Sequence, residues 1–467
     1  MINVKDLGVV GDGKTDDTQA IQDAINYVGE LGGGMLYFPP GTYVVNPAND
    51  RNITLTSNLT LKGAGDSSVI KVSDDAGDYF TIFGHRGGVR PDMLRNIIIE
   101  DLKIDQNPEG NTTCDVSKHN PNPNHRQHVF SFYNFENVRI RSVSFDPTTS
   151  MNTITLNDKT ARFASVKDCY FNFVRGKTTD PNYDNSAIYF QCFEHVATGN
   201  HFTTEVGHGI GAIETHTGIS VIANNTIRNY LVGVHVQHAE YEHANMNIHG
   251  NTIVDAGRGI LLWGHKEVPL KNVNISNNLI KVNNLARNVL PIGGIVAAAN
   301  GHNSDVYNLN ISGNTVEFDE ETEPRDVSLT YIAGISLDNR FQTKQNVNIS
   351  GNNILNSPSF GISVGNYNGT GSLENTVIQG NTITNAGHAP YGEDRRKVFI
   401  EVRGLAYNIL VANNALLETH ETGRAYAAIR STAIADGSDC VSVAGNVVKS
   451  SQELRVENFE RESIKNG

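Results

Sequence analysis

The sequence predicts an all-β protein that folds as a right-handed parallel β-helix with an N-terminal capping helix. The first observation behind this prediction is a phrase that returns through the second half of the chain: a small residue or Asn, then Asn, any residue and an apolar residue. Its copies lie about 25 to 38 residues apart, and self-similarity at such a period is typical of solenoids. The repeated position is held by Asn200, Asn225, Asn251, Asn278, Asn314, Asn352, Asn381, Asn414 and Asn446.

The second observation is an alternating run between successive asparagines, opened by a small and a β-branched residue, as in Gly233-Val234-His235-Val236-Gln237. Alternation with period two indicates a half-buried strand. One coil cannot bury its own apolar face, so its Ile, Val and Leu must stack on those of neighbouring coils. Asn suits the turns because it tolerates left-handed backbone and bonds locally, and stacked Asn side chains can bond along the axis.

Chain length and net charge agree with a solenoid and exclude some classes of binding partner. A chain of 467 residues is too long for one compact core, whereas coils touch only their neighbours. The net charge of -13 argues against nucleic acid or an anionic membrane as a partner. No apolar run approaches the ~20 residues of a membrane span, and the first residues are not a signal peptide. We therefore expect either a protein made in the cytoplasm without Sec export or a sequence from which a leader has been trimmed.

The cysteines predict neither a metal site nor a required disulfide. They are scattered, whereas metal ligands usually come in closely spaced pairs, so we expect reduced thiols at Cys114, Cys169, Cys192 and Cys440. The sequence holds no cofactor motif. We expect no metal and no cofactor.

Three segments follow along the chain. Residues 1–50 predict a cap: a strand, a turn, a helix opened by the capping-box pattern of Asp16 and Gln19, and a second strand. The helix places apolar residues on one face, which would cover the open end of the first coil. Residues 51–450 predict the β-helix, with early strands near 59–62 and 138–141. Residues 451–467 are charged and helix-compatible, and predict a C-terminal cap or tail.

Long polar insertions interrupt the coils at 106–128, 175–185, 281–292, 318–330 and 388–397. Loops of this length in a compact fold are usually functional or disordered. All but the first precede a strand of the Gly-Ile type, so we expect them to wall a groove on one side. A solvated excursion or a subunit contact is the alternative, and we favour it for 106–128.

The opening of the chain resembles the pectate lyase superfamily. The similarity covers residues 3–8, 11–18, 32–34 and 37–43, with the turn Gly11-Asp12-Gly13-Lys14 at its centre. The resemblance implies the β-helix and a carbohydrate substrate. It leaves the reaction open, because the superfamily includes polysaccharide lyases, glycoside hydrolases, uronan epimerases and phage tailspike depolymerases.

The candidate site lies on the outward columns of the strands. If each opening Ile faces the core, the next residue and the one two further on face outward, and on adjacent rungs these are His, Glu, Gln and the single Trp. A rung spacing of about 4.8 Å would set them side by side. An aromatic face near amides and imidazoles suits a sugar ring, although the Trp can also be an ordinary surface aromatic. The residues are Glu214, His216, His235, Gln237, Trp263 and His265.

Hydrolysis of a glycosidic bond needs two carboxyl groups. We assign one to Glu214 and expect the second from the loops, at Asp184 or Glu205, with Asp180 weighed beside them. His216 and His235 would orient these acids or bind hydroxyls. Each carboxylate can instead be solvated or paired in a salt bridge.

A second outward patch mixes signs, at Asp338, Arg340, Glu401, Arg403 and Arg430. The arginines can bind an acidic sugar or pair with the acids, and we favour pairing. Family motifs add little. Polygalacturonases carry several motifs of which this sequence has only Gly207-His208-Gly209, which makes His208 a weak substrate-binding candidate. The epimerase motif Asp-Pro-His-Glu is reduced to Asp146-Pro147-Thr148-Thr149.

We predict a depolymerase of a bacterial surface polysaccharide that works by hydrolysis, similar to tailspikes. One alternative is a lyase in which His216 or His235 takes a proton beside a uronate carboxylate whose charge an arginine or a metal neutralises. The other is a glycan-binding spike without turnover. The resemblance to tailspikes further implies a homotrimer and a virion or extracellular surface location.

Overall fold

The computed structural model describes residues 1–49, 51–85, 92–111, 127–150, 152–174, 186–205, 209–216, 218–238, 245–264, 268–283, 292–299, 304–319, 332–338, 341–365, 371–387, 397–419, 425–434, 441–450 and 455–457. The chain divides into two compact units, Met1–Tyr230 and Leu231–Gly467. The predicted segments 1–50, 51–450 and 451–467 stay a prediction.

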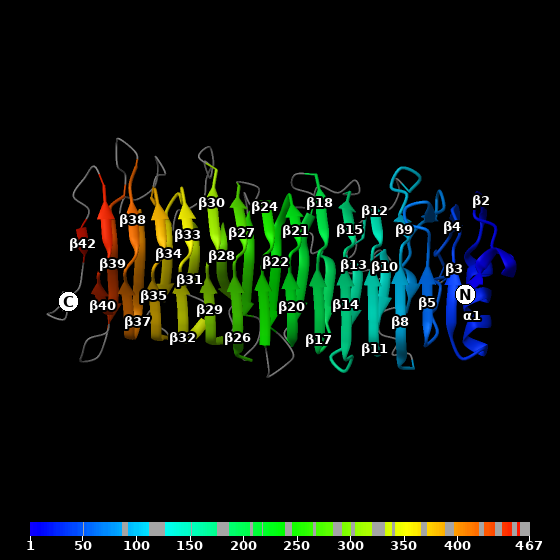
Figure 1. The fold of residues 1–467 in the computed structure, drawn as a ribbon, viewed down its shortest axis with the longest axis horizontal. Coiled ribbons are helices and arrows are strands. Elements are labelled where there is room, and N and C mark those ends of the chain that lie inside the picture. Colours follow the sequence, from blue (N-terminus) through cyan, green and yellow to red (C-terminus); the bar gives the residue numbers. More distant parts are fainter. Residues whose placement is uncertain are drawn as a thin grey trace. The chain divides into compact units, whose positions relative to one another are not determined.

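Each unit is a parallel β-helix in which three strands per coil pair in parallel with their counterparts one coil on, as Figure 1 shows. This confirms the predicted fold class. In the first unit the series that carries the candidate site is β7 (Thr81–Gly84), β10 (His128–Phe132), β13 (Asn152–Asn157), β16 (Ser186–Gln191) and β19 (Gly209–His216). The second series is β3 (Gly34–Tyr37), β5 (Leu59–Lys62), β8 (Leu94–Glu100), β11 (Phe135–Arg141), β14 (Phe163–Lys167), β17 (Glu194–Thr198) and β20 (Ile219–Ala223). The third series is β2 (Asp12–Asp16), β4 (Gly41–Val45), β6 (Ser68–Val72), β9 (Lys103–Asp105), β12 (Ser144–Thr148), β15 (Tyr170–Phe173), β18 (His201–Thr204) and β21 (Thr226–Arg228).

The second unit repeats the same three series. The first is β22 (Tyr230–His238), β25 (Arg258–Gly264), β28 (Ile292–Ala299), β31 (Ile332–Asp338), β34 (Phe360–Gly365), the start of β37 (Val398–Ala412), and β39 (Ala427–Ile434). The second is β23 (Asn245–His249), β26 (Leu270–Ser276), β29 (Ser304–Ser312), β32 (Phe341–Ser350), β35 (Ser372–Gln379), the end of β37, and β40 (Val441–Ala444). The third is β24 (Thr252–Ala256), β27 (Leu279–Val282), β30 (Thr315–Phe318), β33 (Asn353–Leu355), β36 (Thr382–Thr384), β38 (Ala415–Leu417) and β41 (Val447–Lys449).

The core consists of inward columns that stack coil on coil. In the third series of the first unit the rings of Phe145, Phe171 and Phe202 form one column, with centroids 4.6 Å and 4.7 Å apart. The Ile and Val residues that open the first-series strands are fully buried, as predicted, including Ile213 and Ile260. Each residue is therefore held by its neighbours above and below, which is the condition for a solenoid to be stable.

The asparagine ladder forms as predicted. The backbone N–H and the side-chain amide of Asn278 both donate to Oδ1 of Asn314, at 3.0 Å and 2.9 Å, and Asn314 repeats the pattern on Asn352. The residue before each ladder Asn has positive φ, for example 55° at Asn277 and 65° at Gly313. Left-handed backbone favours Gly and Asn, which explains the small residue or Asn that opens each phrase.

The N-terminal helix α1 (Thr18–Glu30) buries Ile21, Ala24, Ile25 and Val28. It contacts β3 and β5, which agrees with a capping role. The predicted capping box does not form, because the helix begins after Asp17 and no side chain caps it there. The carboxylate of Asp17 is engaged elsewhere: it accepts the N–H groups of Val10 and Gly11 at 2.7 Å and 2.9 Å.

The ends of the first long insertion are not a solvated excursion. Gln106 and Gln127 are buried, and Gln106 Nε2 donates to the carbonyl of Gln127 at 2.7 Å. Ser150 Oγ lies 2.7 Å from Oε1 of Gln106 and 2.6 Å from the carbonyl oxygen of Gln127, so its one hydrogen is shared between two acceptors. Residues 112–126 lie outside the described part of the chain, as do 175–185, 284–291, 320–331 and 388–396. The groove that these insertions were expected to wall stays a prediction.

Of the predicted C-terminal cap or tail at 451–467, the structure describes residues 455–457. Residues 455–457 form strand β42 (Arg455–Glu457), which pairs in parallel with β39. The reason is that the open edge of β39 offers unpaired backbone groups to the next segment that reaches it.

Two of the four cysteines lie in the described part of the chain. Cys169 and Cys192 are buried, free thiols, as predicted. Burial raises the pKa of Cys169 to about 12, and it also raises the pKa of Cys192. Within the described residues, no helix is long and apolar enough to cross a membrane.

Candidate functional site

The first unit carries a buried acid–base pair on the outward face of β19. Nε2 of His216 lies 3.0 Å from Oε1 of Glu214, and each side chain is only 8% exposed. The two residues are two positions apart on one strand, so alternation points both side chains to the same face. Outward side chains of a sheet are usually solvated, and this pair is not.

Both oxygens of Glu214 accept hydrogen bonds. Oε1 faces His216, and Oε2 accepts the hydroxyl of Ser186 at 2.7 Å. Nδ1 of His216 is buried and has no hydrogen-bond partner among the described residues. If Nε2–H donates to Glu214, Nδ1 holds the free lone pair. The arrangement therefore favours one tautomer of the imidazole, in which Nδ1 can accept a proton.

Neighbouring strands add an aromatic ring and amides to this face. Tyr189 pairs with Glu214 in the register of β16 and β19, and its ring lies 4.7 Å from that of His216. Asn157 and Gln191 pair across β13 and β16, and both are half-buried. Such amides can donate to sugar hydroxyls or to a carboxylate.

Behind β19 a second histidine supports the pair from inside the coil. Nε2 of His195 lies 2.5 Å from the hydroxyl of Thr215, the residue between Glu214 and His216. Nδ1 of His195 lies 3.1 Å from the carbonyl of Cys192. Burial lowers the pKa of His195 to about 4. A neutral His195 therefore fixes the hydroxyl of Thr215.

In the second unit His235 and Trp263 form an edge-to-face pair. Their ring centroids are 6.3 Å apart at 89°, and Gln237 pairs with Trp263 in the register of β22 and β25. Trp263 is half-buried and packs against a cluster that includes Leu261 and Val296. Part of the indole ring of Trp263 therefore contacts this cluster and does not face solvent. Glu214 belongs to the first unit, and His235, Gln237 and Trp263 belong to the second. Their predicted adjacency therefore stays a prediction.

The second outward patch is an ion-paired cluster, as favoured from the sequence. Glu401 pairs with Arg403, and Nε of Arg430 donates to Glu401 at 2.7 Å. The guanidinium carbon of Arg403 lies 4.6 Å from the ring centroid of Phe360. Glu401 and Arg403 are each 1% exposed. The cluster explains how these charges are kept out of water without a ligand.

The remaining predicted residues fall into two groups. Glu205 is described and lies exposed just after β18. Asp180, Asp184, His208, His265 and Arg340 lie outside the described residues, as does the side chain of Asp338. Among the residues that the structure describes, no three His, Cys, Asp or Glu side chains form a group that could hold a metal ion.

Sequence reasoning missed Ser186 and Asn157 as members of the site. Their strands, β16 and β13, lack the Gly-Ile phrase that marks the later coils. The alternation, continued two coils toward the N-terminus from Glu214, could have found Asn157. It could not have found Ser186, whose contact with Glu214 depends on the register of β16 and β19.

Curated relatives share short stretches with this chain. Alginate lyase 7 of Azotobacter vinelandii is 36% identical over 169 residues, which are 34% of this chain and 19% of that protein. Mannuronan C5-epimerase AlgE6 of the same organism is 33% identical over 195 residues, 38% of this chain and 21% of that protein. Plasmin and fibronectin-binding protein A of Streptococcus pneumoniae is 62% identical over 45 residues, 9% of this chain and 6% of that protein. The chain thus spans about a fifth or less of these relatives.

Solved structures share the fold. The tailspike protein of E. coli bacteriophage HK620, in complex with a pentasaccharide, aligns with a TM-score of 0.69 at 18% identity, and covers 100% of this chain and 77% of that one. The surface adhesin PfbA of Streptococcus pneumoniae aligns with a TM-score of 0.57 at 19% identity, and covers 81% and 90%.

One family description matches more than half of the chain, over residues 1–284, which include Glu214 and His216. On this match, and with the parallel β-helix it requires, the chain belongs to the pectate lyase-like family of rhamnogalacturonase A and epimerase.

Proposed function

We propose that this chain acts on a uronate-containing polysaccharide and that His216 takes the proton at C5 of a uronate residue. The observation that carries the proposal is the buried pair of Glu214 and His216. Both oxygens of Glu214 already accept hydrogen bonds, so this carboxylate is placed to orient the imidazole rather than to protonate a leaving group. A positioned imidazole is the commonest general base in enzymes.

Removal of the C5 proton leads to β-elimination. The electrons of the C5–H bond form a C4–C5 double bond, the C4–O4 bond breaks, and O4 takes the proton that His216 can return. The developing charge beside the carboxylate needs hydrogen-bond donors. Asn157 and Gln191, on the two strands before β19, supply amide groups on this face. The names of the relatives, an alginate lyase and a mannuronan C5-epimerase, support a uronan as substrate.

Hydrolysis is the second candidate, favoured by the burial of Glu214, which is 6% exposed. It needs a second carboxyl group at about 5 to 9.5 Å. Asp184 or Glu205 would supply it, and His235, Gln237, Trp263 and His265 would bind sugar further along. Arg403 would bind an acidic sugar in this scheme only after release from Glu401.

One experiment separates the reactions. Polymannuronate, polygalacturonate and rhamnogalacturonan are incubated with the chain in D₂O, and products are followed by ultraviolet absorbance, reducing ends and proton NMR. Elimination gives an absorbing double bond together with new ends. Epimerisation gives deuterium at C5 without new ends, and hydrolysis gives new ends without a double bond. A parent chain that binds these polymers and changes none of them would support the glycan-binding spike.

Variants then test the residues. We expect His216→Gln to lower kcat by about 10² to 10⁴ with little change in KM, because a general base contributes on this scale. Glu214→Gln should lower kcat less and shift the pH profile, because it orients the base. His201→Gln is the matched control, since His201 lies exposed on β18. Full activity of His216→Gln would remove the proposed base.

We further propose that the chain assembles as a homotrimer at a virion or cell surface. The fold shared with a tailspike and a surface adhesin supports this proposal. Light scattering coupled to gel filtration gives the mass, for which a value near 50.9 kDa would mean a monomer.

A further inference from the structure

The first unit has a hollow of about 690 Å³ on a different part of the coil from Glu214. It spans three coils, from β11 across the segment before β14 to the start of β17. Backbone bonds tie these walls together: the N–H of Arg162 donates to Phe135 at 3.2 Å, and the N–H of Glu194 donates to Arg162 at 2.7 Å. Its volume lies within the range of about 300 to 1,000 Å³ that small-molecule sites occupy.

The charges of the hollow differ from those of the whole chain. Three cations, Arg139, Lys159 and Arg162, and two carboxylates, Glu136 and Glu194, line it, which gives a net charge of +1 in a chain of net charge -13. A local excess of positive charge on an acidic protein favours the binding of an anion at this hollow.

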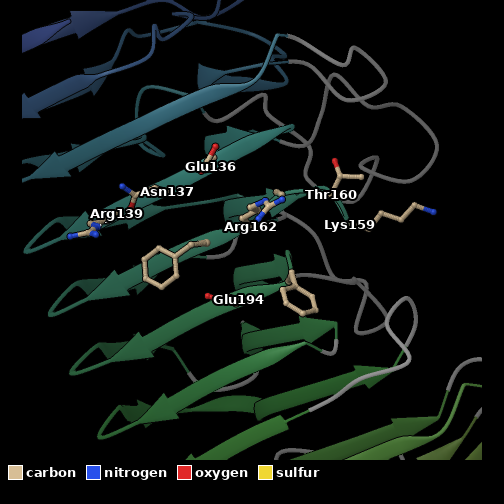
Figure 2. Close-up of a pocket in the computed structure, with 10 residues that line it drawn as sticks. Glu136, Asn137, Arg139, Lys159, Thr160, Arg162 and Glu194 are labelled. Carbon is tan, nitrogen blue, oxygen red and sulfur yellow. Dashed lines mark hydrogen bonds between the residues drawn. The ribbon is translucent and has the colours of Figure 1, made fainter.

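Contacts among the described residues show which groups remain available. Glu136 pairs with Arg95 at 3.3 Å. Arg139 donates through Nε to Asn137 at 2.9 Å and lies over the ring of Phe163. The side chain of Arg162 is exposed and has no hydrogen bond or ion pair within the described part of the chain. Figure 2 shows Arg162 between Arg139 on one side and Lys159 on the other.

The rest of the lining matches a sugar better than a simple anion. Phe163 and Phe193 are half-buried, so each offers part of a ring to the C–H face of a sugar. Glu194 is exposed and can accept hydrogen bonds from hydroxyls. A phosphate or sulfate ion would use only the cations. A sugar acid also uses the aromatic rings, and its hydroxyls can donate to the carboxylates.

We propose that this hollow is a second sugar-binding site, which holds one acidic sugar residue with its carboxylate on Arg162 and Arg139 and its ring against Phe163 or Phe193. Arginine suits this role because its planar fork matches a carboxylate in two parallel hydrogen bonds. The site binds and does not catalyse. Phe193 follows Tyr189 by four residues, so their Cα atoms lie at most about 14 Å apart, and one oligosaccharide can reach from the site of His216 to the hollow.

The choice of a uronate as ligand rests on the proposed function, so the test separates the two. All binding is measured in the His216→Gln background, by saturation-transfer NMR and calorimetry, with a mannuronic acid trisaccharide and its carboxyl-reduced counterpart. We expect the acidic trisaccharide to bind at least about tenfold more tightly, as one charge-assisted pair allows. Arg162→Glu should remove this preference. Lys167→Glu is the control, because it changes the net charge equally from an exposed position on the same strand layer.

Equal binding of the two trisaccharides, or an Arg162→Glu variant that still prefers the acid, would overturn the site. A similar loss in Lys167→Glu would reduce the effect to general charge attraction and would also overturn it. Failure of elimination in the parent chain, with an intact effect of Arg162→Glu on binding, would remove the proposed reaction alone. Thermal melts of each variant confirm that the coils still fold.

Discussion

His195 gives the sharpest test of the interior that supports the candidate site. Its ring is buried between Phe190, whose ring lies 4.6 Å away, and the strand that carries Glu214 and His216. Nδ1 donates to the carbonyl of Cys192, so Nε2 accepts the hydroxyl of Thr215 in the neutral tautomer. Burial is the main reason that the pKa of His195 falls from 6.5 to about 4, with nearby His216 lowering it further.

The pKa difference converts into a loss of stability in acid. Between pH 6.5 and pH 4 the unfolded chain binds a proton at His195 that the folded chain refuses, so stability falls as the pH falls through this window. The full difference of about 2.5 units corresponds to about 3 kcal/mol, of which about 2 kcal/mol is lost by pH 5. Above pH 7 the ring is neutral in both states and contributes no pH dependence.

Replacement of His195 by Gln isolates the contribution of His195 to the pH dependence of stability. Gln can donate to Cys192 and accept from Thr215, and it does not titrate. Urea unfolding of parent and variant at pH 8 and pH 5 cancels the other titrating groups, and we expect the variant to lose about 2 kcal/mol less than the parent. An equal decrease in the free energy of unfolding of the two proteins would show that His195 is not held neutral. It would also contradict the hydrogen bond from the Thr215 hydroxyl to a neutral His195.

Four further substitutions test packing elsewhere, each by calorimetric melting. Asn314→Ala should cost about 2 to 5 kcal/mol, because it removes the acceptor of the backbone N–H and of the side-chain amide of Asn278, the preceding ladder residue, which are buried. Asn310→Ala, in a half-buried ladder of the same coil, should cost less than about 1 kcal/mol. Gly365→Ala should cost at least about 3 kcal/mol, since φ is 104° and the new Cβ would lie 2.0 Å from the carbonyl oxygen of Arg403. Glu401→Gln should cost about 3 to 5 kcal/mol by leaving buried guanidinium groups without their anion.

The fold was predictable because its rules are local and repeated. The ladder Asn and the small residue before it follow from one backbone conformation, which each coil must adopt again. The helix start was not predictable in the same way. Asp16 and Asp17 carry the same carboxylate, and only the three-dimensional structure shows that Asp17 accepts from Val10 and Gly11 whereas Asp16 accepts from Thr18.

The candidate site was predictable in part for a similar reason. Period-two alternation placed Glu214 and His216 on one outward face, and the structure brings them into contact. It could not show that the face is dry, because burial of an outward column depends on what lies over the strand rather than on the strand. Nor could it show Ser186, whose bond to Glu214 depends on the register of two strands 28 residues apart.

The two buried outward clusters differ in whether they hold a titratable nitrogen without a hydrogen-bond partner, and this difference supports the proposed function. In the cluster of Glu401 the carboxylate is neutralised by arginines that stay charged at any pH, so no proton can move there. In the pair of Glu214 and His216 one nitrogen of a titratable ring lacks a hydrogen-bond partner among the described residues. A low local dielectric strengthens the bond that orients this ring. Of the two, only His216 combines a fixed orientation with a site for a proton, and chemistry at C5 requires both.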